Sequence, residues 1–315
     1  MFQKNKHYYI NKKDHINILL FILTFLIIIY ISIKYYIYYS KENIETFINL
    51  KKYNFAIMAI FKNEQDYIEE WLNHHISQGF EQIYLYCNDP DIAKYPSFDK
   101  YKNNVKLINW VNKKNNGGYT IQKQAYTNCV QTYSNDCQFL LMLDLDEFIV
   151  PIKNYSKVSD YFNSLKYNWK NIKAFKIQRY DFGSNGHITK PIGSVMSNYE
   201  YHEKICSSYK TMANTDFINK KAIFYGVHDF NFTDVNGYVY NDYFGYHETG
   251  FPNACKSNSV NEIPIVINHY YTKSYHEYIA RCELWKDGGI NPIGHRKDCE
   301  SKFKSRDVNE INEYK

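Results

Sequence analysis

The 315-residue sequence lacks the patterns that identify several classes of binding protein. None of its seven cysteines forms a Cys-x-x-Cys pair, which argues against a zinc ribbon and against a thioredoxin-type redox site. The net charge of +5 is small and the lysines are scattered along the chain. A nucleic-acid-binding protein usually gathers its positive charge on one stripe or helix, so no nucleic-acid partner is expected. No internal repeat is visible either.

The composition that is present is that of a globular chain. Hydrophobic residues make up 44% and charged residues 23%, which excludes a disordered or collagen-like protein. The length allows one large α/β domain or two smaller ones. Two Asn-x-Ser/Thr sequons begin at Asn154 and Asn231, and in so Asn-rich a chain both can arise by chance.

No charged residue occurs between Ile16 and Ile33, where Leu, Ile and Phe dominate. At a rise of 1.5 Å per residue this segment covers roughly 27 Å, close to the thickness of the hydrocarbon core of a bilayer. Four lysines precede it, and the positive-inside rule then keeps the N-terminus in the cytoplasm. The sequence predicts a cytoplasmic tail at 1–15, a transmembrane signal anchor at 16–39 and a stem at 40–53.

The rest of the chain would then be lumenal or extracellular, as in a single-pass type II protein of a Golgi-like, ER-like or viral membrane. Membrane lipid is the expected partner of the N-terminal helix. A cleaved signal peptide is the main alternative. Against it, no small-x-small cleavage site follows the apolar segment, which continues as Lys34-Tyr35-Tyr36. The basic flank argues against a second alternative, a buried core helix.

Beyond the stem, predicted strands and helices alternate. The continuous apolar run Phe55–Phe61 indicates a strand buried on both faces. The alternation implies right-handed crossovers and a mostly parallel sheet, and hence an α/β domain at 54–286. A polar C-terminal tail with little order is expected at 287–315. The other predicted strands are 82–87, 105–110, one within 138–150, 173–180, 222–227, 237–246 and 263–271, and the predicted helices are 65–78, 120–133, 158–167 and 274–285.

Two carboxylates, Asp144 and Asp146, follow the apolar run Leu140–Leu143. In strand geometry they point the same way, and ligands of parallel sheets bind outside the carboxyl ends of the strands. Two carboxylates on one face repel each other unless a cation lies between them, and Mn²⁺ or Mg²⁺ prefers such oxygen ligands. The pattern therefore favours a divalent-metal site. The simpler alternative is an acidic turn after a buried strand.

A second polar cluster contains His269 and Lys273, between a predicted strand and a predicted helix. An imidazole at a strand end can complete the coordination of an ion, and a lysine is a point charge suited to a diphosphate. The alternative is a surface histidine near a lysine at the start of a helix. By itself this cluster does not identify a function.

Several blocks occur in order along the chain: Ala59–Glu64, Ile68–Leu72, Gly79–Tyr86, Gln122, Ala125-Tyr126, Cys129, Leu143–Pro151, Phe182–His187, Lys210 and Asn268–Ser274. Together they resemble glycosyltransferase family 92, which is related to the family 2 transferases, and the resemblance covers Phe55 to about Trp285. It implies a GT-A nucleotide-diphospho-sugar transferase fold, a UDP-sugar donor, Mn²⁺ bound by the Asp-x-Asp and an inverting transfer, often of galactose. A short cytoplasmic tail, one anchor and a lumenal catalytic domain is also how Golgi transferases are built.

The resemblance implies a metal site and a site for the diphosphate. Asp146 and His269 would bind the metal, with Asp144 on the metal or on the ribose. Lys273 would stabilise the departing diphosphate, and Lys210 would reach a phosphate or the acceptor, a glycan or glycoprotein hydroxyl.

The nucleoside of the donor would lie beside Asn63, Glu64 and Asp89, which follow the first two predicted strands. Family 2-like members usually have an Asp-Asn or Asp-x-Ser run after the second strand. This chain instead reads Cys87-Asn88-Asp89-Pro90 there, so the position of Asp89 differs from that pattern.

An inverting transfer also needs a base to take the acceptor proton, and none of the matching blocks supplies it. Asp229 and Glu248 are candidates because each stands beside a histidine near the end of a predicted strand. Ordinary surface carboxylates are the alternative at both positions.

Three other classes of protein share parts of this pattern. A non-catalytic, membrane-anchored sugar-binding module would use aromatics and a bound ion without turnover. A metal-dependent phosphodiesterase or nuclease would use paired carboxylates for two ions, but only one such pair is evident. A structural envelope protein would bind no nucleotide.

Overall fold

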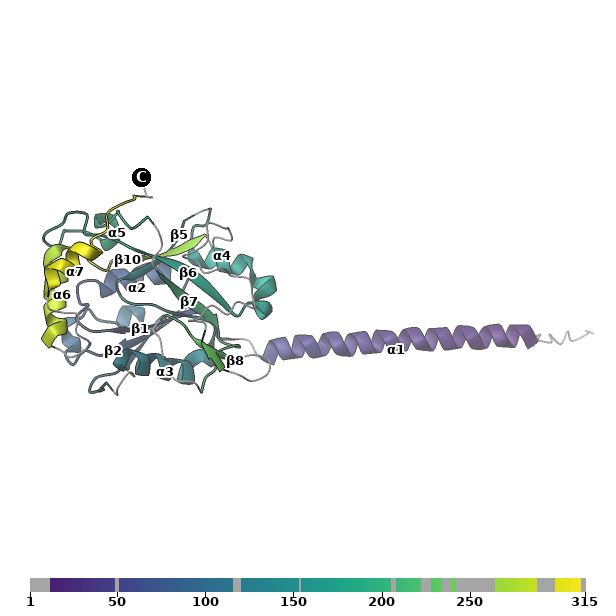
Figure 1. Ribbon diagram of the computed structural model, residues 1–315. Helices are drawn as coiled ribbons and strands as arrows, with labels where there is room; N and C mark the ends of the chain where they lie inside the picture. Colours follow the sequence, from purple (N-terminus) through teal and green to yellow (C-terminus); the bar gives the residue numbers. More distant parts are fainter. Residues whose placement is uncertain are drawn as a thin grey trace, which may run out of the picture. The chain divides into compact units, whose positions relative to one another are not determined.

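The structure is a computed structural model that describes residues 12–48, 51–115, 120–152, 154–204, 208–221, 228–233, 239–241, 264–287 and 298–312. The chain divides into two compact units, residues 1–50 and residues 51–315. Figure 1 labels helices in both units and strands in the second.

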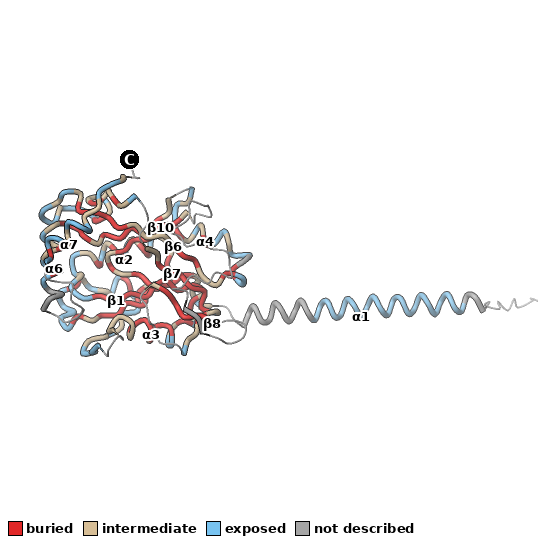
Figure 2. The backbone as a smooth tube through the Cα atoms, in the orientation of Figure 1, coloured by how far each residue is buried: buried red, intermediate tan, exposed pale blue. Residues whose placement is uncertain are grey.

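The described residues of the first unit form one helix, α1 (Lys12–Ile48). Its segment His15–Ile37, 23 residues long, is long and apolar enough to cross a membrane. The residues of this segment are exposed, as the pale blue part of the tube shows (Figure 2). An apolar surface of this size is unfavourable in water, because it far exceeds the apolar patches of soluble monomers. The expected N-terminal apolar helix is therefore confirmed.

The second unit is an α/β domain built on one eight-stranded sheet with the order β3-β2-β1-β4-β7-β6-β10-β5. β1, β2, β3 and β4 run parallel, as do β6 and β10, so the predicted mostly parallel sheet is confirmed. A separate pair joins β8 (Asn231–Thr233) to β9 (Val239–Asn241). The strands of the main sheet are β1 (Tyr53–Phe61), β2 (Gln82–Cys87), β3 (Val105–Asn109), β4 (Cys137–Met142), β5 (Glu147–Pro151), β6 (Ala174–Asp181), β7 (Ser208–Asn214) and β10 (Ile265–His269).

Helices cover both faces of this sheet. On α2 the residues Ile68, Trp71 and Leu72 pack against the buried side chains of one face of β1. On α3, Ala125 and Tyr126 pack against the opposite face. Successive side chains of a strand point to opposite faces, so a strand buried on both sides reads as a continuous apolar run. The helices are α2 (Ile68–Ser77), α3 (Ile121–Tyr133), α4 (Val158–Ser164), α5 (Val195–Asn198), α6 (Tyr275–Asp287) and α7 (Cys299–Arg306), with 3-10 turns at Ile92–Lys94, Asp99–Tyr101, Ser134–Asp136 and Lys166–Asn171.

The segment 138–150, expected to contain one strand, instead contains two: β4 near the middle of the sheet order and β5 at its end. The backbone turns between them. The amide of Glu147 donates to the carbonyl oxygen of Asp144 at 3.1 Å, and the amide of Tyr270 donates to that of Asp146 at 2.8 Å. β5 then pairs antiparallel with β10. Asp144 and Asp146 therefore lie in a turn and not on one strand face.

The strand β7 was not predicted, although it lies at the centre of the sheet between β4 and β6. Its sequence SYKTMAN mixes polar and apolar residues, and three of its polar side chains, Lys210, Thr211 and Asn214, are buried. The predicted strand 222–227 lies outside the described residues. Only 239–241 of the predicted strand 237–246 is described as a strand.

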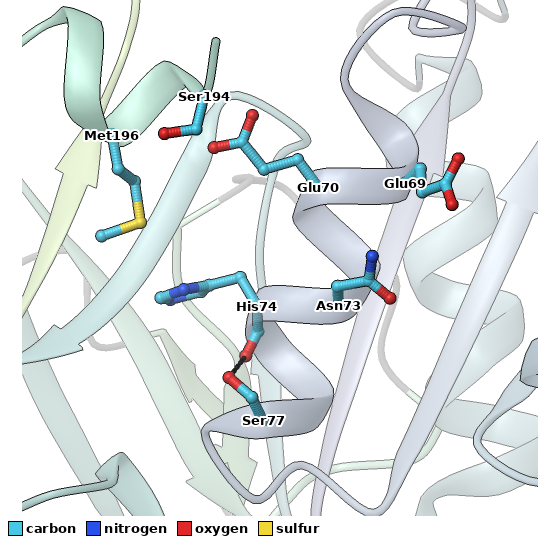
Figure 3. A pocket seen from close by; sticks show the side chains of 7 residues that line it. All are labelled: Glu69, Glu70, Asn73, His74, Ser77, Ser194 and Met196. Carbon is cyan, nitrogen blue, oxygen red and sulfur yellow. Dashed lines mark hydrogen bonds between the residues drawn. The ribbon is translucent and has the colours of Figure 1, made fainter.

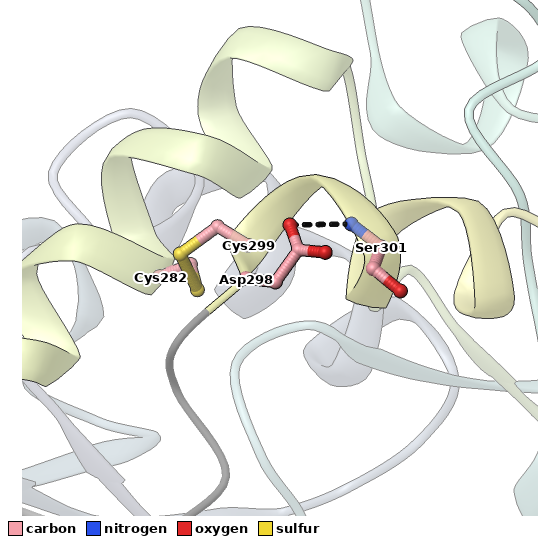
Figure 4. Close-up of a disulfide and its surroundings, with 4 residues drawn as sticks. All are labelled: Cys282, Asp298, Cys299 and Ser301. Atoms are coloured by element: carbon pink, nitrogen blue, oxygen red, sulfur yellow. Dashed lines mark hydrogen bonds between the residues drawn. A yellow bond between two sulfur atoms is a disulfide. The ribbon is translucent and has the colours of Figure 1, made fainter.

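The C-terminal tail expected at 287–315 is wrong for the part that the structure describes. Helix α7 is joined to α6 by a disulfide between Cys282 and Cys299, and the Asp298 side chain accepts from the amide of Ser301 at the start of α7 (Figure 4). After α7, the carbonyl oxygen of Ile311 accepts from the amide of His202 at 2.9 Å. The polar composition reflects an exposed helix bound to the domain by a few specific contacts.

Candidate active site

The carboxyl ends of six strands meet at one edge of the sheet. β6 and β10 run in the same direction as β1 to β4, because β7 lies antiparallel between β4 and β6. β5 and β7 begin at this edge, with Glu147 opposite His269 and Ser208 opposite Arg179. In open α/β sheets ligands bind at this edge. The structure brings to it the predicted site residues Asn63, Glu64, Asp89, Asp144, Asp146, Lys210, His269 and Lys273.

His269, at the end of β10, is held between two carboxylates. Its Nδ1 lies 2.6 Å from Oδ1 of Asp181, at the end of β6, and its Nε2 lies 3.6 Å from Oδ1 of Asp146. Burial alone would lower the pKa of His269, but Asp146 and Asp181 outweigh burial and raise it to about 9. His269 thus lies where two carboxylates face the same space, and both of them favour positive charge on its ring.

Arg281, on α6, brings a second cation to Asp146. Its Nη1 lies 3.2 Å from Oδ2 of Asp146, and its Nη2 donates to the carbonyl oxygen of Tyr271. The guanidinium carbon lies 4.8 Å from the centre of the Tyr271 ring, so an aromatic face and a carboxylate together fix its orientation. Burial would raise the pKa of Asp146, but His269 and Arg281 outweigh burial and lower it, so this carboxylate is ionised.

Lys210 lies between Asp144 and Glu147. Its Nζ is 2.8 Å from Oδ2 of Asp144 and 3.1 Å from Oε2 of Glu147, and its side chain is fully buried. Nη1 of Arg179 lies 3.1 Å from the other oxygen of Glu147. Burial would lower the pKa of Lys210, but the two carboxylates outweigh it and raise the pKa. The fully buried Glu147 is therefore compensated by two cations, as a buried charge requires.

The other oxygen of Asp144 faces helix α3. Oδ1 accepts a hydrogen bond from Nε2 of Gln122 at 2.8 Å and another from the hydroxyl of Tyr126 at 3.2 Å. Asp144 keeps 31% of its side chain exposed, whereas Asp146 keeps 15%. A ligand at this edge can therefore reach both carboxylates. Asp144 also accepts hydrogen bonds from the Gln122 and Tyr126 side chains.

Lys273 faces the loop that follows β1. Its Nζ lies 3.7 Å from Oε2 of Glu64 and 3.6 Å from the centre of the Tyr67 ring. The backbone of Lys273 has φ of 51°, an uncommon conformation for a residue with a side chain. Burial raises the pKa of Glu64 and outweighs the opposing effect of Lys273. Such a strained lysine, held over an aromatic ring, is typical of a functional loop.

Asp89 has a structural role in joining the loops after β1 and β2. Its Oδ2 lies 2.6 Å from Nζ of Lys94 and accepts from the hydroxyl of Tyr95 at 2.8 Å and from the amide of Asn63 at 3.1 Å. Burial would raise the pKa of Asp89, but these contacts outweigh it and lower the pKa to about 2. Asp89 is 4% exposed, so its carboxylate mainly shapes the loop that carries Asn63.

The two candidate bases are placed differently. Asp229 is buried; it is ion-paired with Lys176 and accepts from the hydroxyls of Tyr209 at 3.0 Å and Thr211 at 2.7 Å. Tyr209 and Thr211 flank Lys210 on β7, and successive side chains alternate between faces, so Asp229 lies on the opposite face of the strand from Lys210. The structure therefore does not bring Asp229 to Asp144. Glu248 lies outside the described residues.

The donor atoms at this edge suit a hard divalent cation that shares its coordination with a substrate. Among the described residues, no group of three or more Asp, Glu, His or Cys side chains is arranged to hold a metal ion alone. Mg²⁺ and Mn²⁺, however, are often bound by one or two carboxylates together with substrate phosphates. Nε2 of His269 lies 3.6 Å from Oδ1 of Asp146, and Asp181 holds the ring in place through Nδ1. A ligand histidine is oriented in this way in many metal sites.

Four residues of this edge were given no role from the sequence. Glu147 is the last residue of the acidic run 144–147, but nothing in the sequence indicates that it is buried. Asp181 was placed just after a predicted strand, and Arg179 inside that strand. Arg281 is one of several charged residues on a helix, and no local pattern distinguishes it. Their importance depends on pairings between distant segments, which a single sequence does not reveal.

A surface pocket of about 590 Å³ lies between α2 and the segment around α5. Figure 3 shows the side chains that line it, which include Glu70, His74 and Met196. His74 points its Nε2 at the carbonyl oxygen of Ile149, 2.8 Å away. None of the predicted site residues lines this pocket, so the candidate active site is the polar edge of the sheet and not this cavity.

Comparison with known proteins identifies similar chains in plants. The chain is 22% identical over 192 residues to a glycosyltransferase family 92 protein of Ricinus communis, and 21% identical over 192 residues to one of Oryza sativa subsp. japonica. Each match covers 60% of this chain, and 33% and 31% of the respective relatives. The chain thus spans about a third of the length of these curated relatives. A relative from Arabidopsis thaliana is 19% identical over 204 residues, which cover 60% of this chain and 33% of that protein.

Among solved structures, Staphylococcus aureus TarS (residues 1–349) aligns with 51% of this chain and 47% of its own, at 18% identity and a TM-score of 0.32. The model of glycosyltransferase family 92 matches residues 51–286, which contain every predicted site residue. The α/β fold class expected from the alternation of strands and helices is confirmed, and so is the family resemblance. The chain belongs to glycosyltransferase family 92.

Proposed function

We propose that this chain is a membrane-anchored, metal-dependent, inverting glycosyltransferase that moves a sugar from a UDP-sugar to a hydroxyl of a glycan or glycoprotein. Family membership supports glycosyl transfer. The observation that carries the finer proposal is the pairing of Asp146 with His269 at the carboxyl edge of the sheet, with Nε2 of His269 3.6 Å from Oδ1 of Asp146. Two cations lie at the same edge: Arg281 contacts Asp146, and Lys273 contacts Glu64. Galactose is the first donor sugar to test.

Binding of the donor diphosphate would depend on this edge. Asp146 and His269 would hold Mn²⁺ or Mg²⁺, and Asp144 would bind the same ion or the ribose. When bound, the ion would neutralise charge on the leaving diphosphate. Arg281 and Lys273 are positioned to bind phosphate oxygens, because both carry their charge at the same edge as Asp146.

The remaining residues would orient the reactants. Asn63 and Glu64 would contact the nucleoside, on a loop that Asp89 holds in shape through its bond to the amide of Asn63. Lys210 would position Asp144 and Glu147 through its ion pairs with both carboxylates. For the base that takes the acceptor proton, Glu248 is the stronger candidate, since the Asp229 carboxylate is already bound by Lys176 and two hydroxyls.

We also propose a type II topology, with α1 as the anchor and the α/β domain in the lumen or outside the cell. Four lysines precede the apolar segment, which supports a cytoplasmic N-terminus. The disulfide between Cys282 and Cys299 supports the same arrangement, because disulfides persist in oxidising compartments.

The experiment is a donor screen on the full chain in detergent, in which release of UDP is measured with Mn²⁺, with Mg²⁺ and with excess chelator. UDP-galactose, UDP-glucose and UDP-N-acetylglucosamine are the donors, each with and without glycan acceptors. Metal-dependent release that rises with an acceptor supports the proposal. Binding of UDP without release from any donor would instead favour a sugar-binding module. Cleavage of a phosphodiester substrate with no sugar transfer would favour the phosphodiesterase.

A further inference from the structure

Two sequons in the α/β domain occupy very different positions in the fold. Asn154 and Ser156 are both exposed, in the turn between β5 and α4. Asn231, by contrast, is 5% exposed on β8, between the buried side chains of Phe230 and Phe232. Its carbonyl oxygen also accepts from the amide of Asn219 at 2.7 Å. An oligosaccharide needs an asparagine whose amide projects into solvent, and only Asn154 meets this condition.

The conformation at Asn154 suits an acceptor loop. Its φ is 45°, in the left-handed region that asparagine tolerates better than most residues. The turn is bounded by Pro151 at the end of β5 and by Val158 at the start of α4, so Asn154 projects from a short connection between two ordered elements. Glycosylated sequons characteristically lie in surface loops.

The position of Asn154 also leaves the candidate active site open. β5 starts at Glu147, which pairs with His269 at the carboxyl edge, and ends at Pro151, which pairs with Ile265. Four residues of extended strand carry the chain about 14 Å away from that edge. Asn154 follows Pro151 by three residues. A glycan on it therefore extends from the end of the sheet opposite to the carboxyl edge and does not cover the donor site.

We propose that Asn154 carries an N-linked oligosaccharide and that Asn231 does not. This inference depends on the lumenal placement proposed above. The acceptor reaction joins Nδ2 of Asn154 to the anomeric carbon of a lipid-diphosphate-linked oligosaccharide, and a membrane-bound oligosaccharyltransferase catalyses it. The carbon–oxygen bond to the diphosphate breaks, the amide loses one proton, and the lipid diphosphate leaves with the electron pair.

The test is translation of the full chain in the presence of ER microsomes, followed by electrophoresis with and without an amidase that removes N-linked glycans. The expected result is a single glycan-sized shift in the wild type, which the amidase removes. Asn154→Gln and Ser156→Ala should both abolish the shift. Ser156→Ala keeps Asn154 and its turn conformation, so a folding defect in Asn154→Gln cannot explain agreement between the two. Thr233→Ala removes the second sequon, keeps the buried Asn231, and should leave the shift unchanged.

Protease added to the sealed microsomes separates failure of the site from failure of the topology. A protected α/β domain with no shift, or with a shift that survives both Asn154→Gln and Ser156→Ala, would overturn the assignment of Asn154 and leave the lumenal placement standing. An α/β domain that the protease digests, with no shift, would overturn both the assignment and the topology. A shift lost in Thr233→Ala would assign the glycan to Asn231 instead.

Discussion

Nδ1 of His269 lies 2.6 Å from Oδ1 of Asp181, and the two residues end the neighbouring parallel strands β10 and β6. The register of these strands pairs the two residues directly, so the contact follows from the sheet. Because Asp181 occupies one nitrogen of the ring, the other nitrogen is directed at Asp146. The candidate metal site is thus positioned by strand pairing, and Asp181 acts on it through His269.

Asp181→Asn should weaken Mn²⁺ binding, because a neutral amide orients the His269 imidazole less firmly than the carboxylate does. The substitution also removes a negative charge near the candidate metal site. A loss of about 10–100-fold in Mn²⁺ affinity is expected, as for other residues that support a metal ligand. Calorimetric titration of Mn²⁺ in the presence of UDP measures it. Arg306→Met is the matched control: the Arg306 side chain is 56% exposed and contacts Asp181 at 3.6 Å on the side away from His269, so its loss should change affinity little. Equal Mn²⁺ affinities in wild type and Asp181→Asn would rule out the positioning role.

Lys210→Met should destabilise the fold, because it leaves the fully buried Glu147 and the partly exposed Asp144 without their shared cation. Removing one partner of a buried ion pair typically costs about 3–5 kcal/mol of unfolding free energy. Urea unfolding measures this value. Lys100→Met, which removes an exposed partner of Glu69, should change the free energy of unfolding far less, because water screens an ion pair at the surface. A similar small loss in both variants would contradict the pairing assigned to Lys210.

Asp89 should make the stability of the domain dependent on acid pH. Its pKa is lowered to about 2, below the value of about 3.9 of an unfolded chain. The stabilisation by its carboxylate is therefore complete above about pH 4 and is lost as the pH falls toward 2. Asp89→Asn should be less stable than wild type at pH 7, by between about 1 and 2 kcal/mol, because a charge-assisted set of hydrogen bonds is weakened.

The check on Asp89 is the free energy of unfolding of both proteins from pH 7 to pH 2.5. The difference between them should shrink through the acid range. A difference that stays constant with pH would show that the carboxylate charge contributes nothing at this position.

The apolar segment of α1 should keep the protein in membranes after washing with alkaline carbonate, and the α/β domain should be protected from protease in sealed vesicles. The expectation follows from a 23-residue segment that is apolar enough to cross a membrane and has a basic N-terminal flank. Immunoblotting of the pellet and wash measures it. Release of a shortened chain into the wash would identify a cleaved signal peptide instead.

Local patterns in the sequence were sufficient for the elements that are buried on both faces. The continuous apolar run of β1 and the helical spacing of Ile68, Trp71 and Leu72 predict their structures, because burial of those side chains is the main source of their stability. The apolar segment of α1 was identified by length and absence of charge in the same way. The order Asp-x-Asp and the polar cluster after β10 predicted which residues meet at the edge.

Pairings between distant segments could not be predicted in this way. The sequence of β7 looks too polar for a central strand. Lys210 can be buried there because it is ion-paired with Asp144 and Glu147, which lie more than sixty residues earlier in the chain. The division of 138–150 into β4 and β5 depends on β10, whose backbone pairs with β5. Helix α7 is fixed by Cys282 and Cys299, and seven cysteines with no recognisable spacing do not indicate which two pair.

The most direct measurement is a calorimetric titration of UDP into the full chain, with Mn²⁺ and with excess chelator, for wild type and Asp146→Asn. Asp99→Asn, an exposed carboxylate in a 3-10 turn, is the control. The account predicts that Mn²⁺ strengthens UDP binding at least tenfold in wild type and in Asp99→Asn. It predicts that this gain is lost in Asp146→Asn while the protein still unfolds in one cooperative transition. UDP affinity that is the same with Mn²⁺ and with chelator in wild type, or a full Mn²⁺ effect in Asp146→Asn, would contradict the proposed donor site.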